Sequence, residues 1–459
     1  MEPIIIVSLL GVTALLSEMF GFKKVLLPLL ILGMAAALCF NQSHWGVNTS
    51  YYHDMLLVNN YSVAFSSLLI VVAGIWLVFS GPYFTEIAFR ADRAAIIMFS
   101  LTGALVMISF SNLVMLFLGI EILSISMYIL AGSNKKDPAS NEAALKYLLM
   151  GAFATAFLLF GITLVYGVTG TFSLAGIADH VMSGRQQLPA LMHTGILLMM
   201  VGMAFKVAAV PFHFWAPDVY EGAPNEVTSF MMTIVKTAAM GAFFRLFSTC
   251  FAAAGGTWPL ILSVISALTI LTGNIIALYQ QNVKRMLAYS SIAHAGYLLM
   301  AVVAMNQHSA GALLFYLAAY AAATLPAFAV LSALAANGEG TGTEAFRGLA
   351  KRNPLYAFAM AVSLLSLAGI PPAAGFFAKY YLFVAAFQSH YIWLAITGVA
   401  GSLAGVYYYF RIITAMYISR GSRDETPIHA SLPVRVMLLI VIAATVILGI
   451  FPGLLADYF

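Results

Sequence analysis

The stretch VGMAFKVAAVPFHFWAPDVYEGAPNEVTSFMMTIVKT, residues 201–237, places charged side chains in strongly apolar sequence. Lys206 lies in an apolar segment that Pro211 interrupts, and a second apolar segment, after a short polar turn, carries Lys236. Moving an ammonium group into hydrocarbon costs about 2.5–3.5 kcal/mol even on lenient insertion scales. Two such lysines beside a proline-broken helix therefore indicate a function.

The composition is that of a polytopic membrane protein. Of the 459 residues, 62% are hydrophobic and only 8% are charged, whereas soluble domains are about 25% charged. Apolar runs of about 20 residues, long enough to cross a bilayer as helices, recur along the chain. A transmembrane barrel would show short alternating segments instead. We therefore predict an all-α integral membrane protein.

About fourteen apolar segments are candidate membrane spans. They lie roughly at 3–20, 22–40, 62–80, 94–110, 112–131, 142–168, 191–215, 226–250, 257–279, 285–306, 309–336, 354–388, 391–417 and 433–455. Short joints between them are typical of antiparallel neighbours in a bundle. The first segment lacks a basic leader and a small-residue cleavage site, so we interpret it as a retained span.

The basic residues fall in every second joint, that is, in every second loop between spans. This alternation supports an even number of spans. Of the 21 lysines and arginines, sixteen fall in alternate joints, one falls in the opposite joints, and four lie within spans. The sixteen are Lys23, Lys24, Arg90, Arg93, Lys135, Lys136, Lys146, Lys284, Arg285, Arg347, Lys351, Arg352, Arg411, Arg420, Arg423 and Arg435. Arg185 alone lies on the opposite side. The positive-inside rule makes the basic side cytoplasmic and places both termini outside.

Four titratable side chains within the spans are candidates for proton transfer: Glu121, Lys206, Lys236 and Lys379. Glu121 is the only carboxylate near mid-membrane, and we expect it to pair with Lys206. Burial favours the neutral form of each group and pairing favours the charged form, so a nearby charge can move a proton between them. Intramembrane charges are functional by default. A structural ion pair, and snorkelling of the other two lysines, are the alternatives.

Two proline-interrupted spans indicate an internal repeat. Pro211 interrupts one span, and Pro371 and Pro372 interrupt another shortly before Lys379. Paired broken spans point to an ion site in transporter-like folds, although each proline alone can be a packing kink. Five spans separate the breaks, and an odd repeat length inverts the topology, so we predict two inverted five-helix repeats. The expected parts are a three-helix segment at 1–93, a first repeat at 94–250, a second, inverted repeat at 257–417, and a loop with a C-terminal helix at 418–459.

His294 is the fifth candidate for the relay. It lies in the polar centre SSIAHAGY of a span and can link Lys236 to Lys379 through water, because imidazole transfers protons near neutral pH. A core histidine with satisfied hydrogen bonds is the alternative. No dinucleotide fingerprint, Walker loop, metal-spaced His/Cys set or nucleophile elbow is present. We therefore expect no cofactor, no metal and no nucleic acid on this chain.

The stretch FKVAAVPFHFWAPDVYEGAPNEVTSFMMTIVKTAAM resembles the signature of the antiporter-like subunits of respiratory complex I. Its form PFHFWAPDVYEGAP is more similar to the subunit N branch than to the L and M branches or to the Mrp-type antiporter subunits. The stretches QNVKRMLAYSSIAHAGYLL and LSLAGIPPAAGFFAKYYLF are also similar to that branch. The resemblance covers essentially the whole chain.

This resemblance implies a fourteen-helix subunit of a proton-pumping membrane arm, built from two inverted five-helix repeats. It implies that the family's relay residues correspond to Glu121, Lys206, Lys236 and Lys379. The implied setting is a bacterial inner membrane, with K-type and M-type subunits as neighbours and both termini periplasmic. NADH, FMN, iron–sulfur clusters and quinone are implied for partner subunits, with no redox centre in this chain.

The resemblance leaves two alternative functions open beside proton translocation driven by quinone reduction. A subunit of a multisubunit cation/proton antiporter, or of a related membrane hydrogenase, would share the fold and the lysines. A structural membrane scaffold of such a complex would not need four charges within the spans. A measurement of proton pumping separates the scaffold from the other two.

Overall fold

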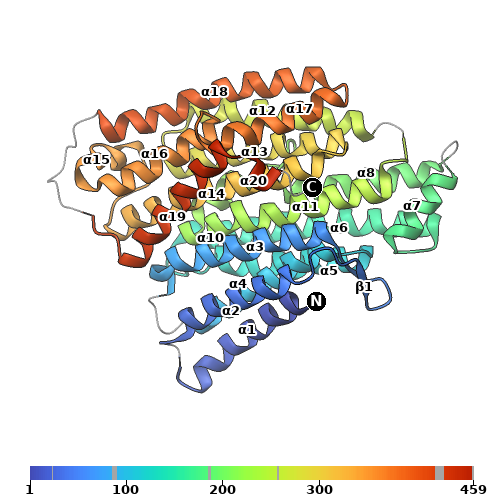
Figure 1. Cartoon of the computed structure of the whole chain (residues 1–459), viewed down its shortest axis with the longest axis horizontal. Coiled ribbons are helices and arrows are strands. Elements are labelled where there is room, and N and C mark those ends of the chain that lie inside the picture. Colours follow the sequence, from blue (N-terminus) through green and yellow to red (C-terminus); the bar gives the residue numbers. More distant parts are fainter. Residues whose placement is uncertain (23, 85–89, 185–187, 256–257, 419–427, 457–459) are drawn as a thin grey trace. The chain divides into compact units, whose positions relative to one another are not determined.

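The computed structural model describes residues 1–22, 24–84, 90–184, 188–255, 258–418 and 428–456 (Figure 1). These residues are mostly helical, and they form two compact units. The first comprises residues 1–77, 81–215 and 234–262, and the second comprises 78–80, 216–233 and 263–459. Among the basic residues of the joints, Lys23, Arg185, Arg420 and Arg423 lie outside the described part of the chain.

The first unit is a set of long apolar helices with one small hairpin. Its helices are α1 (Glu2–Met19), α2 (Leu26–Gln42), α3 (Asn60–Phe79), α4 (Arg90–Ser109), α5 (Leu113–Ala131), α6 (Pro138–Thr169), α7 (Leu174–Ser183), α8 (Ala190–Lys206) and α11 (Lys236–Leu246). Strands β1 (Thr49–Tyr51) and β2 (Leu56–Val58) pair antiparallel, with Ser50 opposite Leu57. A 3₁₀ turn, η1 (Gly81–Phe84), precedes α4, and the π-helical turn η4 (Phe247–Phe251) follows α11.

The second unit combines long helices with four short ones, α9, α10, α15 and α20. Its helices are α9 (Trp215–Gly222), α10 (Asn225–Phe230), α12 (Trp258–Tyr279), α13 (Val283–Ala304), α14 (Ser309–Ala336), α15 (Leu349–Arg352), α16 (Pro354–Ala368), α17 (Ala374–Gln388), α18 (Ile392–Tyr417), α19 (Leu432–Ile450) and α20 (Gly453–Ala456). A 3₁₀ turn, η5 (Thr343–Phe346), precedes α15. The π-helical turn η3 (Met231–Val235) joins α10 to α11.

The helices confirm the predicted all-α membrane architecture. Eleven described helices or helical runs are long and apolar enough to cross a membrane, and shorter apolar helices cover the predicted spans that contain α2, α8 and α16. Together these fourteen correspond one to one to the fourteen predicted segments. Spans 191–215 and 354–388 are discontinuous as predicted: α8 stops at Lys206 before Pro211, and α16 stops at Ala368 before Pro371.

Helices α5 and α13 begin in the same way. The side chain of Asn112 accepts a hydrogen bond from the Val114 amide at 2.9 Å, and that of Asn282 accepts one from the Lys284 amide at 2.9 Å. Asparagine is a preferred N-cap because its side-chain oxygen satisfies an otherwise unpaired amide of the first turn. Each asparagine also forms an isolated antiparallel bridge, Asn112 with Ser173 and Asn282 with Gly342. The segments that begin α5 and α13 therefore adopt similar local structures.

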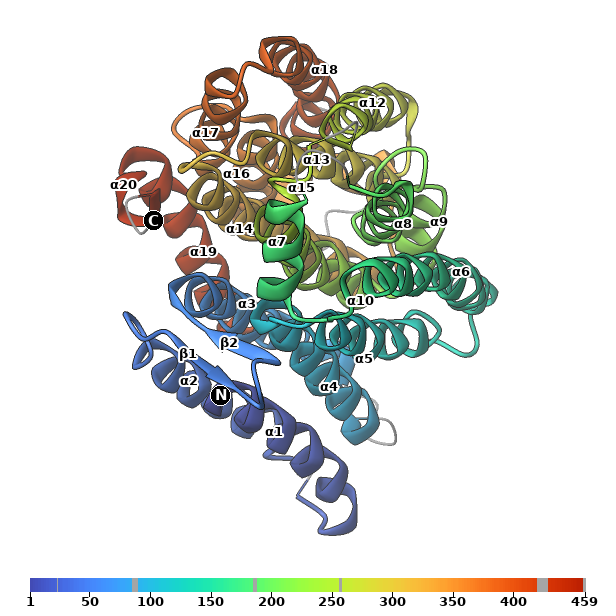
Figure 2. The same cartoon turned by 90° about the vertical axis from the view of Figure 1, so that its right-hand side faces the viewer.

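Glycines bring the backbones of neighbouring helices into contact. A Cβ on Gly161 of α6 would lie 2.8 Å from the Gly195 carbonyl oxygen of α8, and a Cβ on Gly195 would lie 3.1 Å from that of Gly161. A Cβ on Gly103 of α4 would lie 2.7 Å from the Leu123 amide nitrogen of α5, its neighbour in Figure 2. Lipid gives little hydrophobic drive for association, so small residues that permit close packing take its place.

Candidate functional site

The first unit holds three of the five predicted relay residues. Glu121 lies in the middle of α5, Lys206 is the last residue of α8, and Lys236 is the first residue of α11. The two lysines are 6% and 2% exposed, respectively. Helices α8 and α11 contact each other. Both lysines are therefore buried.

The predicted ion pair between Glu121 and Lys206 does not form in this structure, although both side chains are described. Neither the Glu121 Oε1 atom nor the Lys206 Nζ atom has a hydrogen-bond partner, and both atoms are buried. The Lys206 ammonium lies 5.6 Å from the centre of the Tyr128 ring, an arrangement that favours a cation electrostatically. No hydrogen bond therefore fixes a proton on the Lys206 amine or on the Glu121 Oε1 atom.

Trp215 adds a side-chain hydrogen bond at the end of α8, where the Phe205 carbonyl also accepts from the Ala208 amide at 3.0 Å. Its indole Nε1–H donates to the Phe205 carbonyl at 3.1 Å, and its ring stacks on Tyr147 with centroids 4.6 Å apart. The last carbonyls of a helix carry a partial negative charge, which stabilises a nearby cation. Lys206 therefore lies where the end of α8 favours an ammonium.

Lys236 follows directly after a π-helical turn, η3. Such turns widen a helix by one residue and are frequent at functional sites. The sequence MMTIV of this turn contains neither proline nor glycine, so nothing in it distinguishes the turn from ordinary apolar helix. The sequence therefore gives no signal for this turn.

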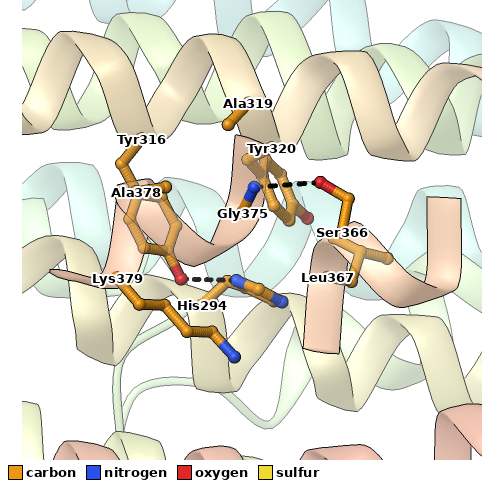
Figure 3. A pocket seen from close by; sticks show the side chains of 9 residues that line it. All are labelled: His294, Tyr316, Ala319, Tyr320, Ser366, Leu367, Gly375, Ala378 and Lys379. Atoms are coloured by element: carbon orange, nitrogen blue, oxygen red, sulfur yellow. Dashed lines mark hydrogen bonds between the residues drawn. The ribbon is translucent and has the colours of Figure 1, made fainter. Parts of the chain in front are cut away.

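In the second unit, His294 and Lys379 line one small cavity. Figure 3 shows the Lys379 side chain running alongside the His294 ring, with Tyr316 and Tyr320 above them. His294 Nδ1 lies 2.6 Å from the Tyr316 hydroxyl, and His294 Nε2 lies 3.3 Å from the Tyr409 hydroxyl. The structure thus brings these two predicted relay residues together, in a site built mainly from α13, α14 and α17.

Lys379 reaches back across the break between α16 and α17. Its ammonium donates a hydrogen bond of 2.9 Å to the Ala368 carbonyl, the last of α16, and lies 5.2 Å from the centre of the Tyr297 ring. Gly369 follows with φ of +82°, and a Cβ there would lie 2.9 Å from Lys379 Cδ. The chain turns in a conformation that favours glycine, and the same glycine leaves room for the lysine.

The aromatic hydroxyl groups around these lysines were not anticipated from the sequence. Tyr128, Tyr316 and Tyr409 lie beside relay candidates inside their units. Nothing local in the sequence separates them from packing tyrosines. Within the described ranges, no group of three or more His, Cys, Asp or Glu side chains is placed to hold a metal ion.

Comparisons with known proteins agree with this architecture. Residues 111–405 match the family described as "NADH:quinone oxidoreductase/Mrp antiporter, TM". The chain is 44% identical to NADH-quinone oxidoreductase subunit N of Cytophaga hutchinsonii, covering 99% of this chain and 98% of that protein. It is 42% identical to subunit N of Flavobacterium johnsoniae, covering 100% and 99%.

Solved structures show the same relationship. A chain of respiratory complex I from Thermus thermophilus with bound aureothin matches with a TM-score of 0.84 at 33% identity, covering 99% of this chain and 98% of that one. A chain of the Mrp complex from Dietzia sp. matches with a TM-score of 0.88 at 20% identity, covering 99% and 95%; at that identity it shows the shared fold alone. This chain therefore belongs to the family of NADH-quinone oxidoreductase subunit N.

Proposed function

We propose that Glu121, Lys206, Lys236, His294 and Lys379 form, in this order, the proton relay of a proton-translocating membrane subunit of NADH-quinone oxidoreductase. One observation carries the proposal. Each unit holds a buried lysine at the carbonyl end of a broken apolar helix, Lys206 at the end of α8 and Lys379 at the end of α16. A structural scaffold has no need for such costly groups.

The arrangement at Glu121 and Lys206 suits a switch driven by charge. No hydrogen bond holds the buried Nζ of Lys206, so its protonation responds to the surrounding field. A unit charge that appears about 10 Å away changes the electrostatic energy of the Lys206 ammonium by roughly 1.7 kcal/mol, at an effective dielectric constant of about 20. A difference of about 1.4 kcal/mol shifts a proton equilibrium tenfold. A charge change in a neighbouring subunit therefore suffices to move a proton from Lys206 onward.

Quinone reduction elsewhere in the complex supplies that charge change. NADH, FMN, iron–sulfur clusters and quinone bind to partner subunits in this proposal, and K-type and M-type subunits flank this chain in the lipid bilayer. The basic joints face the cytoplasm, and both termini face the periplasm of a bacterial inner membrane. The asymmetry of sixteen basic residues against one supports this orientation.

The relay is tested by Lys206→Ala and Lys379→Ala in the assembled complex, purified through a tag on this chain. We expect both variants to lose most proton transport per NADH oxidised, because each removes a titratable group from the path. Lys146→Ala is the control, since Lys146 is a partly exposed lysine paired with Glu142 on the surface of α6. The measurements are NADH-driven quinone reduction and proton uptake into vesicles.

Two results would contradict the proposal. Normal pumping in both variants would exclude the relay. Co-purification with cation/proton antiporter subunits, in place of quinone-oxidoreductase subunits, would exclude the proposed complex.

A further inference from the structure

The imidazole of His294 lies between two tyrosine hydroxyls that come from different helices. Tyr316 of α14 faces Nδ1 at 2.6 Å, and Tyr409 of α18 faces Nε2 at 3.3 Å. The Tyr409 hydroxyl also shares a hydrogen bond with Ser290 Oγ, one turn before His294 on α13. All four side chains are at most 4% exposed. Figure 3 shows that Tyr316 and Lys379 line the same cavity as the imidazole ring.

A buried histidine can change its charge only if both of its states find hydrogen-bond partners. Neutral imidazole has one donor and one acceptor nitrogen, whereas imidazolium has two donors. A carbonyl partner suits only a donor nitrogen, but a hydroxyl can either donate or accept. His294 has a hydroxyl at each nitrogen, so its surroundings satisfy both states.

From this geometry we propose that Tyr316 and Tyr409 are positioning residues that make His294 a proton carrier for Lys379. The inference rests on the proposed relay and assigns it two further residues. When a proton arrives from the cavity side, it binds to the ring nitrogen that has no hydrogen. That nitrogen then donates to its tyrosine oxygen, and the hydroxyl hydrogen of this tyrosine turns away from the ring.

The hydroxyl hydrogen of Tyr409 has a defined alternative position. It can point to His294 Nε2 or to Ser290 Oγ, because the Tyr409 oxygen lies within hydrogen-bond distance of both. Tyr316 turns its hydrogen into the cavity that Lys379 lines. No bond to carbon or oxygen breaks, and one proton enters the ring and later leaves it toward Lys379. The tyrosines only exchange the direction of their hydrogen bonds.

Other groups also surround His294. The rings of Tyr297 and Tyr320 lie 5.8 Å and 5.0 Å from the imidazole centre as aromatic neighbours. Lys379 is the charged group of the same cavity. Tyr408, the neighbour of Tyr409, donates to Asn274 Oδ1 at 3.0 Å.

The test compares Tyr409→Phe and Tyr316→Phe with Tyr408→Phe in the assembled complex. Each change removes one hydroxyl from a buried site, and Tyr408 and Tyr409 are both 1% exposed on the same helix. We expect at least a fivefold loss of protons pumped per NADH in the first two variants, and less than a twofold loss in Tyr408→Phe. In Tyr316→Phe and Tyr409→Phe, the pH range in which the complex pumps should also move to lower pH. The reason is that imidazolium without a hydrogen-bond acceptor forms only at higher acidity.

A double variant separates positioning from packing. If Tyr409 acts through the histidine, then His294→Ala with Tyr409→Phe should pump no less than His294→Ala alone, because coupled residues are not additive. Equal losses in Tyr408→Phe and Tyr409→Phe, or an unchanged pH profile, would overturn the inference. If Lys379→Ala abolishes pumping while Tyr316→Phe and Tyr409→Phe pump normally, this inference fails and the relay stands. Normal pumping in both Lys206→Ala and Lys379→Ala would instead remove the relay itself.

Discussion

At the scale of single residues, Lys206 and Lys379 both lie at the carbonyl end of a helix, but they belong to different positions in the chain relative to that helix. Lys206 is itself the last residue of α8, whereas Lys379 belongs to α17 and reaches back to the Ala368 carbonyl at the end of α16. In both cases the carbonyl end of a helix stabilises the ammonium. The carbonyl end of a broken helix therefore offsets part of the cost of burying a charge inside an apolar unit.

Substitution of Gly369 tests whether the position of the Lys379 ammonium depends on the backbone turn between α16 and α17. We predict that Gly369→Ala sharply reduces proton transport, because the new Cβ would lie 2.9 Å from Lys379 Cδ and 3.3 Å from its Nζ. The displaced lysine would lose its bond to Ala368, and leaving that carbonyl unpaired costs about 1–3 kcal/mol. Proton uptake per NADH oxidised is the measurement.

Gly338→Ala is the matched control for this change. Gly338 has φ of +74° and nothing within 4 Å of its Cβ position. It therefore carries the same left-handed penalty of about 1–2 kcal/mol without crowding a lysine. Equal losses in the two variants would show that backbone strain, and not the position of Lys379, explains the effect.

At the scale of elements, α9 is fastened to the start of α13 by a group of charged and polar side chains. Arg285 pairs with Asp218 at 3.1 Å and also with Glu221. The Asn282 amide donates to Glu221 Oε1 at 3.0 Å, and the Lys284 ammonium donates to the Ala223 carbonyl. The short helix that follows the Pro211 break is thereby joined to the helix that carries His294.

We predict that these contacts between α9 and α13 are needed to couple NADH oxidation to proton pumping. They should contribute little to the stability of the complex. Arg285 and its two carboxylate partners are about one-third exposed, and pairs of this kind contribute about 0–1 kcal/mol. Arg285→Gln should therefore leave the melting temperature of the complex nearly unchanged but lower the protons pumped per NADH. Arg347→Gln, which removes an exposed pair with Glu344, is the control.

A charge exchange tests whether the pair itself matters. The variant with both Arg285→Glu and Glu221→Arg keeps opposite charges on the two helices, so it should recover part of the lost pumping. A double variant no better than Arg285→Gln would argue that Arg285 acts in another way.

The matching starts of α5 and α13 bear on the organisation of the chain at the same scale. Each helix is capped by an asparagine that also bridges to a loop about sixty residues later, Ser173 in one case and Gly342 in the other. Each carries a relay candidate near its middle. We propose on this basis that residues 94–250 and 257–417 are the two inverted repeats, since an odd number of spans separates equivalent helices.

At the scale of the whole molecule, the distribution of charge predicts the orientation in the membrane. Lys136 lies in an exposed basic joint between α5 and α6, and His308 lies in the exposed joint between α13 and α14. We predict that a cysteine at Lys136 reacts with an impermeant thiol reagent only from the cytoplasmic side. A cysteine at His308 should react only from the periplasmic side.

The labelling is made in a chain without its exposed native cysteine. Cys39 is exposed and is first replaced by serine, whereas Cys250 is buried and can remain. Intact cells and inverted membrane vesicles give the two sides of access. Reaction of both positions from the same side would refute the predicted number of spans between them.

The sequence by itself determined the properties that depend on neighbouring residues along the chain. Hydropathy over about 20 residues located the fourteen spans, and the prolines located both breaks. The cost of a charge in hydrocarbon singled out Glu121 and the buried lysines, independently of any contact.

Only the tertiary structure decided which groups face each candidate. Tyr409 lies 115 residues from His294 along the chain, and the rotation of α18 about its own axis brings the two together. The expected Glu121–Lys206 ion pair was wrong as a contact, because Lys206 lies over the Tyr128 ring. Hydropathy fixes that a segment spans the membrane, but it leaves open which side of the helix meets which neighbour. That choice comes from close packing at small residues such as Gly161 and Gly195, which depends on both helices at once.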